Sequence, residues 1–145
     1  MRDAHLGSIW EGTSNIVALD VIRAIRRERS LDALREHWDD LLDGLALDEA
    51  FRGTVEDLIA RTTRLAEHAA DGAERETRRA ASALYHLTSA IAMLWEAEQT
   101  GSAERSALAR LTVAHRLQVR DPLAVDAAPD LAVLEDLLLA DQPRC

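Results

Sequence analysis

The sequence is poor in residues that interrupt helices or build sheets. Its three prolines stand at positions 122, 129 and 143, and aromatic residues make up only 3% of the chain. Proline breaks helices and aromatic residues are typical of strands, so their scarcity favours helix. Alanine and leucine dominate the hydrophobic residues, which form 48% of the 145 residues and suffice for one core. The composition therefore predicts an all-α domain.

The sequence also lacks the marks of secreted, membrane and metal-binding proteins. Its single cysteine, Cys145, has no partner, which excludes a disulfide framework and a cysteine metal cluster. No apolar run approaches the ~18 residues of a membrane span, and no apolar stretch follows a basic region at the N-terminus. No two histidines stand four residues apart on one expected helix, as in helical metal sites. We expect a soluble, cytoplasmic protein that binds neither metal nor membrane.

The sequence has fewer basic than acidic residues. The chain has 17 Lys and Arg residues against 26 Asp and Glu, which gives a formal net charge of −9. Such a field repels a nucleic-acid backbone. The arginine-rich segments 26–29 and 75–79 contain glutamates, which is typical of solvated helix faces and helix ends. DNA is therefore an unexpected partner.

Five long helices are expected from the spacing of apolar residues. These residues recur at three- and four-residue steps, as on one face of a helix. Thr13 or Ser14 is the expected N-cap of the first helix. Ser30, Asp48 and Ser102 can cap the second, third and fifth. The expected helices span about 14–29, 30–45, 48–70, 73–99 and 102–121.

These helices predict an antiparallel bundle over residues 1–120. The tail, residues 121–145, contains all three prolines and one short apolar segment, 131–139, that can form a last helix. Trp38 and Trp95 belong to apolar stripes, so both are expected in the core or at an interface.

The segment Trp10-Glu11-Gly12-Thr13-Ser14-Asn15 combines a carboxylate, a glycine and small polar residues where a helix is expected to begin. The glycine lets another molecule approach the backbone, and free N–H groups at a helix N-terminus form a site for phosphate. Burial beside the preceding apolar residues would raise the pKa of Glu11 and make it a competent base. The pattern alone favours a plainer alternative, in which Thr13 or Ser14 is an ordinary cap and Glu11 an exposed acid.

Three segments near the N-terminus carry a family resemblance. They are Arg2-Asp3-Ala4, Ser8-Ile9-Trp10-Glu11-Gly12-Thr13-Ser14-Asn15-Ile16 and Ala18-Leu19-Asp20-Val21. Together they resemble the C-terminal domain of the acyl-CoA dehydrogenase family, whose usual form is an aromatic residue followed by Glu-Gly-Thr. The version with Trp, then Asn-Ile and Leu-Asp-Val-Ile-Arg, is similar to the AidB-like branch of DNA-alkylation-response flavoproteins. The specific resemblance covers residues 2–26.

The resemblance implies a flavin enzyme that removes the α-proton of an acyl-CoA thioester while the β-hydrogen leaves as hydride to FAD. Glu11 would be the catalytic base, and its backbone N–H would help to polarise the thioester carbonyl. Gly12 would border the acyl-CoA substrate. Thr13, Ser14 and Asn15 would contact the FAD. The family also implies homo-oligomers, dimers or tetramers, formed through such helices.

The family's enzymes carry an N-terminal helical domain and a middle β-domain before this glutamate, whereas ten residues precede Glu11. We therefore expect a C-terminal fragment of such an enzyme, inactive and colourless in isolation because most flavin contacts are missing. Two other functions stay open. One is a DNA-associated flavoprotein of the alkylation response, which predicts a basic surface. The other is a non-catalytic helical interaction module that completes a neighbouring polypeptide.

Overall fold

The computed structural model describes residues 14–119, and all regular secondary structure in this range is helical. This confirms the predicted all-α class. No helix in the described range has the length and apolarity needed to cross a membrane. The predicted short helix near 131–139 lies outside the described residues. The elements are α2 (Ser14–Glu28), α3 (Ser30–Leu42), α4 (Glu49–Ala70), the 3-10 turn η1 (Glu74–Glu76), α5 (Thr77–Thr100), α6 (Ala103–Thr112) and the π-helical turn η2 (Val113–Leu117).

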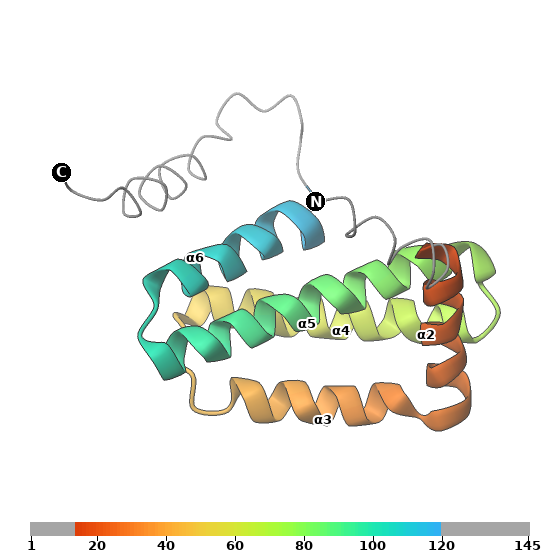
Figure 1. Cartoon of the computed structure of the whole chain (residues 1–145), viewed down its shortest axis with the longest axis horizontal. Coiled ribbons are helices and arrows are strands. Elements are labelled where there is room, and N and C mark those ends of the chain that lie inside the picture. Colours follow the sequence, from red (N-terminus) through yellow and green to blue (C-terminus); the bar gives the residue numbers. More distant parts are fainter. Residues whose placement is uncertain (1–13, 120–145) are drawn as a thin grey trace, which may run out of the picture.

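Helices α3, α4, α5 and α6 run antiparallel in succession, and α2 lies across one end of the bundle (Figure 1). α5 contacts each of the other four α-helices, so it is the central element. α2 packs against α4 and α5 and also touches α3. The antiparallel bundle predicted from the sequence is therefore present, with α2 as a helix across its end.

The hydrophobic core follows one face of α5. Its buried residues include Leu84, Leu87, Ile91 and Leu94, whose three- and four-residue spacing places them on one side of the helix. The largest fully buried side chain is Trp38 of α3, which is 0% exposed. Its indole Nε1–H donates a hydrogen bond to Thr88 Oγ1 at 3.1 Å, so the polar edge of the ring is satisfied. Trp38, predicted in the core or at an interface, lies in the core, whereas Trp95 is 41% exposed, so its predicted role at an interface stays a prediction.

Two of the predicted helix caps are confirmed and one is wrong. The Asp48 carboxylate accepts a hydrogen bond from the Phe51 N–H at 2.9 Å, and Ser102 Oγ accepts one from the Arg105 N–H at 3.3 Å. Ser30 is the first residue of α3, not its cap. Only one residue separates α2 from α3, and this residue, Arg29, takes a left-handed conformation with φ 53° and makes no side-chain cap. The tight connection leaves no extended residue for a capping serine.

Several predicted helix boundaries also differ from the structure. α3 ends at Leu42, because the chain turns through Gly44 with φ 74°, yet Leu45 is still buried from the following loop. α5 begins at Thr77 rather than near residue 73, because η1 occupies the preceding turn. α6 ends at Thr112 and η2 at Leu117, short of the helix end predicted near residue 121, and Val119 is 93% exposed.

A charged contact ties the start of α4 to α6. The Arg110 guanidinium donates a hydrogen bond to Asp48 at 2.7 Å and lies 4.0 Å from the centre of the Phe51 ring. The hydrogen bond from Arg110 and that from the Phe51 N–H hold the pKa of Asp48 below its usual value. One carboxylate therefore caps α4 and joins it to a helix that lies distant in the sequence.

Gly53 and Gly101 are expected to respond in opposite ways to substitution by alanine. Gly53 lies inside α4, and an added Cβ meets nothing within 4 Å, so Gly53→Ala should raise the free energy of unfolding by roughly 0.5–1 kcal/mol. Gly101 ends α5 with φ 66°, a conformation that alanine disfavours, so Gly101→Ala should lower it by about 1 kcal/mol. Urea denaturation followed by circular dichroism measures both changes. Shifts of the same sign would contradict this assignment.

Candidate functional site

The residues predicted to carry chemistry stand at the start of α2. Glu11, Gly12 and Thr13 lie outside the described residues. Ser14 is the first residue of α2, and Asn15 follows it with an exposed side chain. The expectation that a helix opens within this motif agrees with the observed start of α2. The roles of all five residues stay predictions.

The first half of α2 presents apolar side chains to the outside. Ile16, Val17 and Leu19 are each about half exposed, at 51%, 50% and 48%, whereas Ala18 and Ile22 are buried. Residues of this size are normally buried when they recur along one helix. This part of α2 therefore offers apolar surface directly after the motif.

An apolar groove, which we call the α2/α3/α5 groove, lies where these three helices meet. Its volume is about 400 Å³, and the exposed ring of Tyr85, with 68% of its surface accessible, stands at its side. The other lining residues are predominantly aliphatic: Val21, Ile25, Leu31, Leu34, Ala81 and Leu84, together with Ser30 and Thr88. An open groove of this composition suits an apolar side chain from another protein segment.

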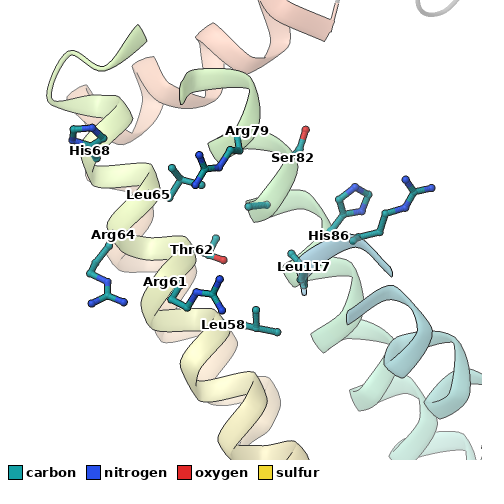
Figure 2. Close-up of a pocket in the computed structure, with 12 residues that line it drawn as sticks. Leu58, Arg61, Thr62, Arg64, Leu65, His68, Arg79, Ser82, His86 and Leu117 are labelled. Atoms are coloured by element: carbon teal, nitrogen blue, oxygen red, sulfur yellow. The ribbon is translucent and has the colours of Figure 1, made fainter. Parts of the chain in front are cut away.

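A second groove lies between α4 and α5, and we call it the α4/α5 groove (Figure 2). It has a volume of about 500 Å³, and none of the described residues that line it is acidic. Its apolar lining is formed by Leu58, Leu65, Ala83 and Leu117. Its polar lining consists of Arg61, Thr62, Arg64, His68, Arg79, Ser82, His86 and Arg116. Four guanidinium groups and two imidazoles thus gather in a chain whose net charge is −9.

Helical periodicity explains how the α4/α5 groove forms. On α4, Arg61, Arg64 or Leu65, and His68 follow one another at three- and four-residue steps. On α5, Arg79, Ser82 or Ala83, and His86 repeat the same spacing. The two helices pack side by side and antiparallel, so both sets border one groove.

Two of the groove's arginines are already paired with acids on their own sides of the groove. Arg61 Nη1 lies 3.2 Å from Asp57 Oδ2, one helical turn earlier on α4, and Arg79 Nη1 lies 3.0 Å from Glu76 Oε2. Both guanidiniums are exposed, although the Glu76 carboxylate is only 25% exposed. Ion pairs of exposed arginines within one helical turn are weak, so they leave the guanidiniums able to bind a second anion. Among residues 14–119, Arg64 and Arg116 form no ion pair.

The pKa of His86 reflects the positive charge and the partial burial of the α4/α5 groove. Its pKa is lowered first by desolvation and second by the positive charge of Arg116. Both effects disfavour the imidazolium, so the ring is predominantly neutral at pH 7. An anion bound in the groove would favour the imidazolium and so raise the pKa of His86. Within the described range, no group of three or more His, Cys, Asp or Glu side chains is placed to hold a metal ion.

The α4/α5 groove does not follow from the sequence pattern, which assigns segment 75–79 to a solvated helix face or end. The useful signal is the spacing along each helix rather than the clustering along the chain. Arg79, Ser82 and His86 share one face, which a count of neighbouring charges does not reveal. Even so, the match of this face to Arg61 of α4 depends on how the two helices pack.

Comparison with known proteins gives one distant relative. No protein-family model matches the chain, and no solved structure matches it. Over 100 residues the chain is 29% identical to Acyl-CoA dehydrogenase family member 11 of Caenorhabditis elegans. The aligned part is 66% of this chain but only 16% of the relative, so the chain spans a small part of the relative's length. The similarity supports the acyl-CoA dehydrogenase family at a distance and does not distinguish the AidB-like branch.

Proposed function

We propose that this chain is the C-terminal helical part of a flavin-dependent acyl-CoA dehydrogenase, and that its activity requires the other domains of such an enzyme. The 29% identity over 100 residues to a protein named for this family is the observation that carries the proposal. The Glu-Gly-Thr motif at residues 11–13, which in the sequence immediately precedes Ser14, the first residue of α2, also supports it.

Glu11 is the proposed catalytic base, which takes the α-proton of the acyl-CoA thioester onto its carboxylate. Bound FAD supplies the acceptor for the hydride that leaves the β-carbon. Gly12 borders the substrate, and Thr13, Ser14 and Asn15 contact the flavin cofactor. A raised pKa makes a carboxylate a stronger base, so the proposal includes a neighbouring domain that covers Glu11 and excludes water.

The start of α2 fits a cofactor that carries phosphate. The first N–H groups of a helix have no partner within it, and together with the helix dipole they favour an anion. The first turn of α2 contains no acidic residue that would oppose such an anion. The isolated chain is proposed to be inactive because flavin binding would also need contacts from the other domains of such an enzyme.

The DNA upstream of Met1, read in the same or a shifted frame, provides the test of this proposal. The upstream-encoded polypeptide should be expressed together with residues 1–145 and purified as one protein or complex. We expect about one FAD per chain and anaerobic bleaching of its absorbance by an acyl-CoA, whereas residues 1–145 alone should be colourless. A complete preparation without flavin would overturn the enzyme proposal, and a yellow isolated chain would overturn the need for other domains.

A helical interaction module is the second candidate function. The α2/α3/α5 groove and the half-exposed Ile16, Val17 and Leu19 favour it, because they offer apolar surface for a neighbouring polypeptide. The same co-expression separates the two functions. A stable complex that retains no flavin and does not react with acyl-CoA would favour the interaction module.

A further inference from the structure

We propose that the α4/α5 groove binds a small organic anion that carries a diphosphate or two neighbouring phosphate groups. This site shares no residue with the motif at residues 11–15, so it goes beyond the proposed function. Its test uses residues 1–145 alone and needs neither FAD nor any other domain. Failure of one proposal therefore leaves the other intact.

The composition of the groove is the first argument. Arg61, Arg64, Arg79 and Arg116 line it, and none of the described residues lining it is acidic. Acidic residues outnumber basic ones in the whole chain by 26 to 17, so this lining departs from the average surface. Guanidinium groups donate paired hydrogen bonds that match the oxygens of phosphate. A recess lined by one sign of charge also concentrates oppositely charged ligands.

The directions of the side chains are the second argument. Figure 2 shows Arg61 and Arg79 extending from opposite helices toward the space between α4 and α5. Arg64 extends away from that space and is placed to attract a ligand rather than to hold it. Two guanidiniums on opposite sides can each bind a different phosphate of one diphosphate. Thr62 and Ser82 add hydroxyl donors from the same two helices.

The apolar part of the lining indicates that the anion is organic. Leu58, Leu65 and Leu117 contribute to the same groove, and they offer no hydrogen bonds to a free inorganic ion. A groove of about 500 Å³ accommodates a small molecule with an apolar or aromatic portion. His86, whose ring is predominantly neutral, can stack on or hydrogen-bond to that portion.

A compact anion fits this surface better than a nucleic-acid duplex. Asp57 and Glu76 stand beside the two central arginines, at 3.2 Å from Arg61 and 3.0 Å from Arg79. An extended polyanion would meet these carboxylates as soon as it left the groove. The net charge of −9 opposes it further. The α4/α5 groove is a short basic recess rather than the basic surface expected of a DNA-associated flavoprotein.

The test is isothermal titration of the full 145-residue chain with inorganic pyrophosphate and with ADP at low salt. We expect both to bind in the micromolar to submillimolar range, with ADP the tighter because its nucleoside meets the apolar lining. Arg61→Gln and Arg79→Gln should each weaken binding by about tenfold or more, since each removes a charged hydrogen bond. Arg35→Gln, which removes an exposed arginine of α3 outside the groove, should change affinity less than twofold.

Several outcomes would overturn the proposal. The first is that neither pyrophosphate nor ADP binds at millimolar concentration. The second is that Arg35→Gln and Arg79→Gln lose affinity equally. A third is tight binding of a 20-base-pair duplex that pyrophosphate and ADP do not displace, which would favour DNA as the partner. Circular dichroism of each variant checks the fold, and all three replaced side chains are exposed.

Discussion

Replacing Trp38 with alanine is expected to lower the free energy of unfolding by about 3–5 kcal/mol. The side chain is 0% exposed and belongs to the main core cluster, so its removal leaves a cavity between α3 and α5. It also removes the donor of the hydrogen bond to Thr88. A loss of this size is a large part of the ~5–15 kcal/mol by which a domain is usually stable. Urea denaturation followed by far-UV circular dichroism measures it.

Trp95→Ala is the matched control, because the same side chain is removed at a position that is 41% exposed. We expect a loss below about 1.5 kcal/mol at Trp95, since less apolar surface returns to water. Trp38→Phe should give an intermediate loss of about 1–3 kcal/mol, because the ring stays apolar but its hydrogen bond to Thr88 disappears. Equal losses in the two alanine variants would contradict the assignment of Trp38 to the core.

The helices of this fold can be predicted because their apolar residues follow the helical period closely. In α3, Leu31 and Trp38 are buried, and Leu34, Leu41 and Leu42 pack against the core, as the stripe indicates. Such a pattern gives the helix one apolar face that must be buried. It therefore predicts the helix from its own residues, without knowledge of the helices that pack against it. Between residues 14 and 119, the helical class and the number of α-helices thus follow from local sequence.

The connections are harder to predict because they depend on packing. Arg29 takes φ 53° although it is not glycine, since only one residue joins α2 to α3. No local propensity favours this conformation for arginine. In α2 the periodic residues include Ile16 and Leu19, which the structure leaves about half exposed. A periodic stripe identifies the apolar face but not whether a neighbour within the same chain covers it.

The two candidate sites are accessible to sequence reasoning to different degrees. The motif at residues 11–15 is contiguous, so its residue types can be interpreted together from the amino-acid sequence alone. The α4/α5 groove joins Arg61 of α4 to Arg79 of α5 and Arg116 of η2, and these approach one another only after the bundle forms. Contiguous motifs can therefore be found in a sequence, whereas sites shared between helices require the packing.

Replacing Glu11 with glutamine is expected to lower the rate of acyl-CoA dehydrogenation by about 100- to 10,000-fold or more in the flavin-loaded complex. Glutamine has nearly the shape of glutamate but cannot take up the α-proton. FAD content and acyl-CoA affinity should change little, because the backbone N–H of residue 11 and residues 12–15 are unaltered. Anaerobic stopped-flow measurement of flavin reduction separates the chemical step from binding.

The control for this variant is Glu28→Gln, which removes the same charge at the exposed end of α2 and should leave the rate unchanged. If Glu11→Gln reduces the flavin as fast as the unaltered complex, the base lies on another element and the motif serves only to bind. If the variant also loses FAD, residue 11 is needed for cofactor binding, and the slower reaction does not identify it as the base. A fully flavin-loaded variant whose flavin reduction stays slow at saturating acyl-CoA supports a catalytic base, because neither misfolding nor weakened binding of flavin or acyl-CoA produces that combination.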